Sequence, residues 1–161
     1  MSARIATPTA EVVGLLAEHW TTAAVHEAGH AVVALTEGQE VKRVSLWHVK
    51  HTSWLRPQEW SVSGLTEVDP QDAETGLLVA VAGVEAECLH TGAPVRRARA
   101  ANPSDLRMVD DYARRTDLTE KRARDRVRNL LADYWPAVET VAGALAVTGS
   151  LSGRDLRRVL R

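Results

Sequence analysis

The sequence feature that constrains this chain most is the pentapeptide His-Glu-Ala-Gly-His at residues 26–30. It lies in a stretch of small apolar residues, 22–35, with the composition of a buried helix. Residues four apart lie on the same face of a helix, so His26 and His30 can direct two imidazole nitrogens at one point. Glu27 lies one position along, where its carboxylate can contact a water bound at that point. This HExxH pattern is typical of zinc sites with two histidine ligands and a glutamate base.

The same pattern has an alternative interpretation, because two histidines and a glutamate can be ordinary core residues with satisfied hydrogen bonds. Three neighbouring ionisable groups in an apolar helix are, however, costly to bury without a shared role. Gly29 lowers helix propensity, but it suits close packing beside a metal. We therefore interpret the pentapeptide as part of a zinc site.

Length and composition are those of one globular domain. The chain has 161 residues, of which 45% are hydrophobic and 25% charged, with a formal net charge of −1. Such a charge gives no general attraction to nucleic acid or anionic membranes. Residues 96–128 hold eleven Lys/Arg against six Asp/Glu, but interleaved acids at helical spacing favour an ion-paired, solvated face. We expect no nucleic-acid partner.

Features of the sequence also indicate a compartment. The single cysteine, Cys88, excludes an internal disulfide and suits a reducing environment. Residues 1–8 lack the plan of a signal peptide, and no apolar run reaches the roughly 18 residues that a membrane span requires. We therefore expect a cytoplasmic protein without a membrane segment.

Two helices are expected before any β structure. Residues 10–19 have an apolar side at helical spacing. The helix that carries the pentapeptide is expected to begin at a cap on Thr21 or Thr22 and to end near Gly38.

The periodicity changes to two between residues 40 and 68, which predicts a hairpin or a short mixed sheet. A Trp-rich connection that contains Pro57 is expected between the strands. A helix of about twenty residues follows and ends at Gly92. Its apolar stripe consists of Leu77, Val81, Val84 and Cys88.

The rest of the chain is expected to be helical apart from a loop at residues 92–103. The expected helices begin at Asn102 or Ser104, at Thr119, at Pro136, and after Ser152-Gly153. The fold class is therefore mainly α with a small β region (α+β). We expect a flexible lead at residues 1–9 and a single domain at residues 10–161.

A catalytic zinc ion normally takes three protein ligands and keeps one position open. The extended pattern HExxHxxGxxH would supply a third histidine, but Val33 and Thr36 occupy its glycine and histidine positions. The other histidines are interpreted as surface or structural residues: His19, His48, His51 and His90. A carboxylate from a later helix is the better candidate.

Several short segments match one family in the same order along the chain. They are His-Glu-Ala-Gly-His-Ala (26–31), Val-Lys-Arg-Val-Ser-Leu (41–46), Gly-Leu-Thr (64–66), Ala-Gly-Val-Glu-Ala-Glu (82–87), Ser-Asp-Leu (104–106) and Gly-Ser-Leu-Ser-Gly-Arg-Asp-Leu (149–156). Together they resemble the peptidase domain of the FtsH family of ATP-dependent zinc proteases, over about residues 20–161. The resemblance implies an FtsH-type zinc peptidase domain, with the HExxH helix followed by a helical C-terminal bundle.

The resemblance also implies roles for single residues. Asp105 corresponds to the third Zn²⁺ ligand, beside His26 and His30, and Glu27 to the general base. Glu87 corresponds to a carboxylate that orients a ligand, or that serves as an alternative ligand. The implied function is that of a zinc-dependent endopeptidase acting on unfolded or flexible polypeptides.

Partners follow from the same resemblance. The sequence has no Gly-x-x-x-x-Gly-Lys-Ser/Thr pattern, so an ATPase partner would be a separate protein, and a homo-oligomer is a further expectation. An edge of the β region could bind the substrate as an added strand. The competing interpretation is a non-catalytic zinc-binding or interaction module that retains the fold. An intact Glu27 argues against it, since structural zinc needs no base.

Overall fold

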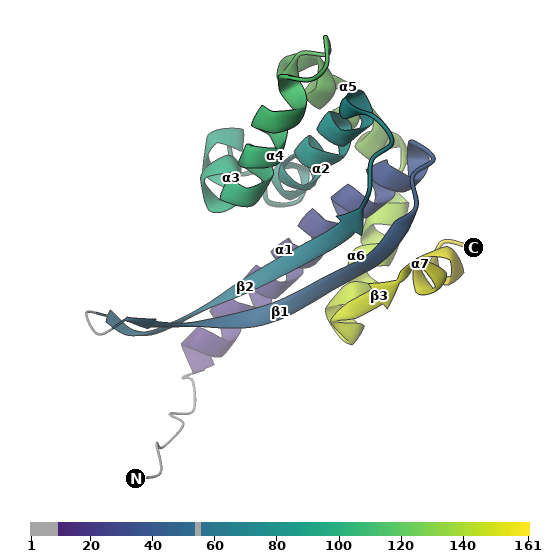
Figure 1. Ribbon diagram of the computed structural model, residues 1–161. Coiled ribbons are helices and arrows are strands. Elements are labelled where there is room, and N and C mark those ends of the chain that lie inside the picture. Colours follow the sequence, from purple (N-terminus) through teal and green to yellow (C-terminus); the bar gives the residue numbers. More distant parts are fainter. Residues whose placement is uncertain (1–9, 54–55) are drawn as a thin grey trace.

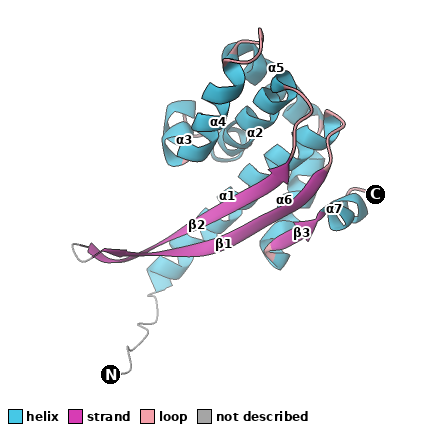
Figure 2. Cartoon of the chain, viewed as in Figure 1, coloured by secondary structure: helices cyan, strands magenta, loops and turns pink. Residues whose placement is uncertain are grey.

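The computed structural model describes the backbone of residues 10–53 and 56–161, and the side chains of residues 14–49 and 61–161. The expected flexible lead at residues 1–9 and the side chain of His51 lie outside this description. The described elements are α1 (Ala10–Thr36), β1 (Val41–Ser53), β2 (Arg56–Val68), α2 (Ala73–Thr91), α3 (Val95–Ala101), α4 (Pro103–Ala113), α5 (Glu120–Asp133), α6 (Trp135–Thr148), β3 (Ser150–Ser152) and α7 (Gly153–Val159). They form a mainly helical fold with a small antiparallel sheet, which confirms the α+β class (Figure 2).

Helix α1 is the element on which the others pack. The β1–β2 hairpin lies along one side of it, and α2 and α6 contact it on others (Figure 1). Residues 24–34 are buried without interruption. A helix surrounded in this way has to be apolar on every side. The contact with α2 is close, because a Cβ on Gly29 would lie 2.6 Å from the Cβ of Ala86.

The expected break at Thr21 or Thr22 is wrong, since α1 is one helix of 27 residues. Thr21 donates its hydroxyl to the Ala17 carbonyl at 3.1 Å, which satisfies a threonine inside a helix. Trp20 fixes this part of the helix, because its indole donates to the Ala146 carbonyl on α6 at 2.9 Å. The predicted end is confirmed, with Gly38 at φ 74° just beyond Thr36.

The sheet has the order β2-β1-β3, with all pairs antiparallel. The predicted hairpin is confirmed, but the predicted connection is too long: β2 begins at Arg56, so Pro57 lies within the strand. Strand β3 has three residues between the end of α6 and the start of α7, and its shortness leaves no periodicity to detect. Because β1 is central, β2 is an outer strand of this sheet.

Helix α2 ends as predicted, with Gly92 at φ 69° as its C-cap. Three residues of the predicted apolar stripe, Leu77, Val81 and Val84, are buried, whereas Cys88 is half-buried. Burial extends beyond the stripe, because residues 75–86 are buried on every side. The cause is tertiary, since α1, α3, α4 and α5 all contact this helix. Even Glu85 is buried, where its carboxylate accepts from Arg124 at 2.5 Å and from Arg128 at 2.6 Å.

The expected loop at residues 92–103 is also wrong, because it contains α3. This short helix follows Pro94 as N-cap and buries Ala98. Helix α4 begins after Asn102, one of its two predicted starts, although the side chain of Asn102 makes no capping hydrogen bond. Helix α5 begins at the predicted cap, Thr119. Within the described residues, no helix is long and apolar enough to cross a membrane.

Candidate metal centre

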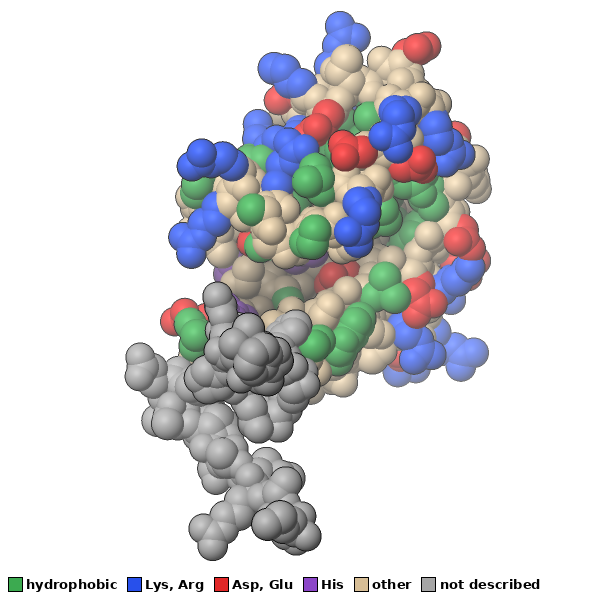
Figure 3. Space-filling model, turned by 60° about the vertical axis from the view of Figure 1, so that its left-hand side comes forward, with side chains coloured by type: hydrophobic (Ala, Val, Ile, Leu, Met, Phe, Trp, Pro, Cys, Tyr) green, Lys and Arg blue, Asp and Glu red, His purple; other side chains and the backbone are tan. Residues whose placement is uncertain are grey.

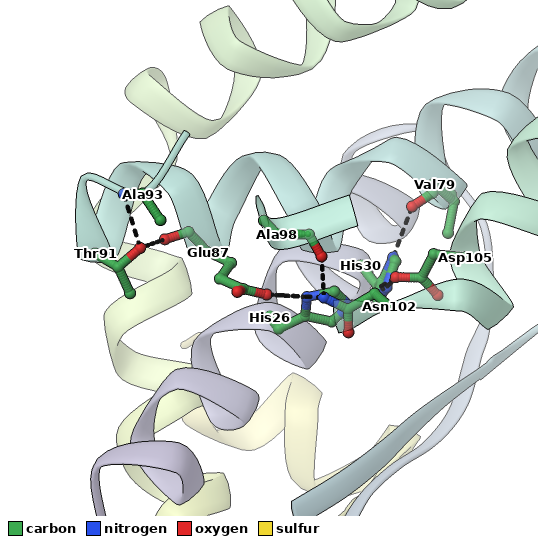
Figure 4. Close-up of polar contacts among 9 residues, drawn as sticks. All are labelled: His26, His30, Val79, Glu87, Thr91, Ala93, Ala98, Asn102 and Asp105. Carbon is green, nitrogen blue, oxygen red and sulfur yellow. Dashed lines mark hydrogen bonds and ion pairs between the residues drawn. The ribbon is translucent and has the colours of Figure 1, made fainter. Parts of the chain in front are cut away.

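Three side chains from two distant helices meet at one point. His26 and His30 come from α1, and Asp105 comes from the first turn of α4. Asp105 Oδ2 lies 2.7 Å from His26 Nε2 and 3.3 Å from His30 Nε2, and the two Nε2 atoms are 3.1 Å apart (Figure 4). All three residues are buried, at 5–7% exposure. The structure thus brings together the three predicted metal ligands.

The hydrogen bonds behind the two rings fix the direction of their lone pairs. His30 Nδ1 lies 2.7 Å from the Val79 carbonyl, which can only accept, so this nitrogen carries the proton. His26 Nδ1 lies 3.1 Å from Glu87 Oε2, a carboxylate oxygen that also accepts. In the neutral rings both Nε2 atoms are therefore acceptors, and they face each other and an aspartate oxygen. Such an arrangement is stable only with a positive charge at its centre, either a proton on one of the rings or a metal ion.

The spacing and chemistry of these atoms suit a metal ion. Ligands bound about 2.0–2.1 Å from a tetrahedral zinc lie roughly 3.3–3.4 Å from one another. The three separations here, 2.7, 3.1 and 3.3 Å, lie at or somewhat below that value. Among the described residues, His26, His30 and Asp105 form a buried group that could hold a metal ion. Two imidazoles and one carboxylate are ligands that zinc and other divalent transition metals bind.

The electrostatics of the site also favour positive charge. Burial lowers the pKa of His26, but hydrogen bonds to Asp105 and Glu87 and the charges of Asp105 and Glu27 outweigh it and raise this pKa to about 10. The pKa of His30 is likewise raised, mainly by Asp105 against the effect of burial. Burial raises the pKa of Asp105, but the two histidines outweigh it, so that this pKa is lowered.

Glu87 lies behind His26 and not among the three converging ligand atoms. Its carboxylate contacts Nδ1 of His26 and accepts from Asn102 Nδ2 at 3.0 Å (Figure 4). Asn102 also donates to the Ala98 carbonyl at 2.8 Å. Asn102, at the start of α4, is thus hydrogen-bonded to Glu87, which in turn contacts His26 on α1. The sequence marked Asn102 only as a helix start, because its contact with Glu87 is made by folding.

The floor of the site depends on a glycine of α2. A Cβ on Gly83 would lie 2.4 Å from the Nε2 atoms of both His26 and His30. Real Cβ atoms do not approach so closely, so only glycine leaves room for the two rings. This residue is the second of the Ala-Gly pair in the segment that resembles the family motif.

Glu27 is buried on the other side of the motif, against β2. The Thr66 hydroxyl oxygen lies 2.7 Å from Glu27 Oε2 and 3.1 Å from the Glu27 carbonyl oxygen, so its single proton is shared between two acceptors, of which the carboxylate oxygen is the nearer. A Cβ on Gly64 would lie 2.5 Å from Glu27 Cγ and Oε1. In the sequence, Gly64 and Thr66 are distinguished only as part of the resemblance.

The site opens into a cleft with a volume of about 480 Å³. Glu27, His30 and Asp105 line it. The strand β2 forms one wall and α4 the other, with residues that include Gly64, Leu65, Thr66 and Val68 on β2, and Ser104, Arg107, Met108 and Tyr112 on α4. Figure 3 shows histidine atoms inside a hollow between the upper and lower parts of the molecule.

The outer edge of β2 borders this cleft. The hydrogen-bond pattern of the sheet shows which residues of β2 direct their peptide groups toward that edge. The N–H of Leu46 donates to the carbonyl of the residue before β3 at 2.8 Å, so Leu46 directs its peptide groups toward β3. Its neighbour Ser45 therefore directs them toward β2, where it lies opposite Leu65. On β2 the alternate residues, Gly64 and Thr66, direct their peptide groups toward the free edge.

The other histidines with described side chains lie outside this group. His19 and His90 are exposed. His48 stacks on Trp20, with the ring centroids 4.6 Å apart. The structure therefore gives these three residues surface or packing positions.

Comparison with known proteins adds nothing to this description: no protein-family model matches the chain, and no curated protein matches it. The resemblance to FtsH-type peptidase domains therefore depends on the matched motifs alone.

Proposed function

We propose that this chain is a zinc-dependent endopeptidase. The observation that carries the proposal is the convergence of His26 Nε2, His30 Nε2 and Asp105 Oδ2 at the base of an open cleft, with the carboxylate of Glu27 lining the same cleft. A purely structural metal site is closed and has no need of a base. The resemblance of the motifs to an FtsH-type peptidase domain supports the same conclusion.

In this proposal His26, His30 and Asp105 would hold the metal. Zinc bound there supplies a Lewis acid for the scissile carbonyl and a water molecule whose pKa is lowered toward neutrality. Glu27 accepts the proton of the attacking water and delivers it to the leaving amine. Glu87 and the Val79 carbonyl accept from Nδ1 of the two rings, which keeps Nε2 free as the ligand atom.

The proposed substrate is an extended segment of a flexible or unfolded polypeptide. The peptide groups of Gly64 and Thr66 face the free edge of β2 beside the cleft, where a substrate strand could pair with them. Pairing of this kind recognises main chain and requires an extended backbone, which a folded substrate does not offer. A separate ATPase or a homo-oligomer, which the resemblance implies, would supply such segments from folded proteins.

The test is hydrolysis of a disordered protein such as casein by the zinc-loaded protein, beside Glu27→Gln. We expect the variant to bind zinc normally and to lose roughly 100-fold or more of the turnover, the range of a general base. Equal turnover by both proteins would remove the peptidase proposal. Zinc binding without turnover by either would instead favour the non-catalytic module.

A further inference from the structure

We propose that Gly64 and Thr66 form a seat for Glu27 that holds its carboxylate in position for proton transfer, which makes Thr66 a positioning residue. We call these two residues the Glu27 seat. Their role in proton transfer rests on the proposed peptidase function. Both residues lie on the side of the motif that faces β2, away from the three converging ligand atoms.

The first contact of the seat is a hydrogen bond from β2 to α1. Thr66 donates its hydroxyl to Glu27 Oε2 at 2.7 Å, over a separation of 39 residues in sequence. Among the described residues, no other side chain or backbone group donates to this carboxylate. Glu27 is 7% exposed, so water has little access to its carboxylate. The hydrogen bond from Thr66 is therefore the main polar contact that orients it.

The second contact is steric. The Cγ and Oε1 atoms of Glu27 occupy the space where any other residue at position 64 would place its Cβ, at 2.5 Å from both atoms. Gly64 therefore lets the carboxylate lie directly against the strand. A glutamate side chain has three rotatable bonds, and the seat restricts them from two directions.

The two carboxylate oxygens acquire different roles in this arrangement. Oε2 accepts from Thr66, whereas Oε1 has no donor among the described residues and lies beside Gly64, which lines the cleft. A base that must accept a proton needs one oxygen free, and orientation of the other improves the geometry of transfer. The structure assigns Oε2 as the anchored oxygen and Oε1 as the proton acceptor.

The decisive variant is Thr66→Val, which keeps the side-chain shape and removes the donor. We expect zinc content equal to wild type, unchanged KM, and kcat lower by roughly 10-fold to 100-fold, the usual cost of a misplaced catalytic group. Thr66→Ser, which retains a hydroxyl, should recover most of that loss. Thr140→Val is the matched control, because this exposed threonine donates only to its own helix at Pro136. If Thr66→Val does not fold, Thr66→Ala makes the same comparison.

A readout independent of turnover is the ¹³C resonance of the Glu27 carboxyl, assigned by its loss in Glu27→Gln. Removal of the donor in Thr66→Val, or the added methyl in Gly64→Ala, should shift this resonance, whereas Thr140→Val should not. An unshifted resonance in both variants would overturn the seat, whether or not the protein is a peptidase. Wild-type kcat in Thr66→Val would overturn it while leaving the peptidase proposal intact. Failure of the proposed function is seen separately, as equal turnover by wild type and Glu27→Gln.

Discussion

The two sides of the HExxH motif are supported by different parts of the molecule. On the ligand side, α2 and α4 place a carbonyl or carboxylate oxygen against every ring nitrogen of His26 and His30. On the base side, β2 supplies one hydroxyl and one glycine for Glu27. Residues that are neighbours in the chain are thus held in place by contacts with different elements. Metal binding and proton transfer should therefore be separable by mutation, although the motif is five residues long.

The largest expected effect comes from two glycine variants, one on the ligand side of the motif and one on the base side. Gly83→Ala places a methyl group 2.4 Å from both Nε2 atoms, so we expect loss of zinc binding and of activity, with overpacking that costs about 1–3 kcal/mol of stability. Gly64→Ala should keep its zinc and lose activity only. Metal analysis of the two purified variants checks this. Normal zinc content in Gly83→Ala would contradict the ligand-side geometry.

A second comparison separates a ligand from the partner of a ligand. Asp105→Ala removes one of the three converging ligand atoms, and we expect it to abolish tight zinc binding. Glu87→Ala removes only the acceptor of His26 Nδ1, so zinc affinity should fall by roughly 10-fold to 100-fold. Competition with a chromogenic chelator measures both constants. The opposite order of effects would make Glu87 the ligand and Asp105 the supporting residue.

In the metal-free protein, the shifted pKa values of His26 and Asp105 should make the stability depend on pH. The pKa of His26 is raised from 6.5 to about 10, so its contribution is complete below pH 6.5 and is lost as the pH rises toward 10. The pKa of Asp105 is lowered from 3.8, so its contribution is present above that pH and is lost in acid.

We therefore expect the melting temperature of the metal-free protein to fall between pH 6.5 and 10, and the fall to become smaller in Asp105→Asn, where Glu87 and Glu27 still raise the pKa of His26. The control is Asp155→Asn, a helix-capping aspartate in α7 far along the chain from the site. A flat profile for the metal-free wild type would contradict the proposed charge balance.

The smallest expected effect concerns the edge of β2 and substrate recognition. Peptide groups of alternate residues face the free edge, so methylation of one substrate peptide nitrogen should raise KM by roughly 3-fold to 10-fold, the value of one hydrogen bond. Methylation of the next nitrogen along should have little effect. Measured KM values for a series of singly methylated peptides check this. A uniform response along the series would argue against strand pairing.

Much of the helical structure could be predicted from local signals. The cap at Thr119 and the glycine ends at Gly38 and Gly92 follow from the sequence, because capping depends on a few adjacent residues. Predictions failed where packing overrode these signals. Thr21 resembles a cap but lies inside α1, and α3 forms in a stretch whose arginines show no apolar periodicity.

For the site, the spacing of the motif is enough to place His26 and His30 on one helix face with Glu27 beside them, because the period of the α-helix fixes that geometry. The groups that complete the site are brought there by folding. Asp105 meets His26 across 79 residues, Glu87 across 61, and Thr66 reaches Glu27 across 39. Such contacts leave no periodic trace in the sequence, since they arise when α2, α4 and β2 bury the apolar sides of α1 and bring their polar groups to the same place.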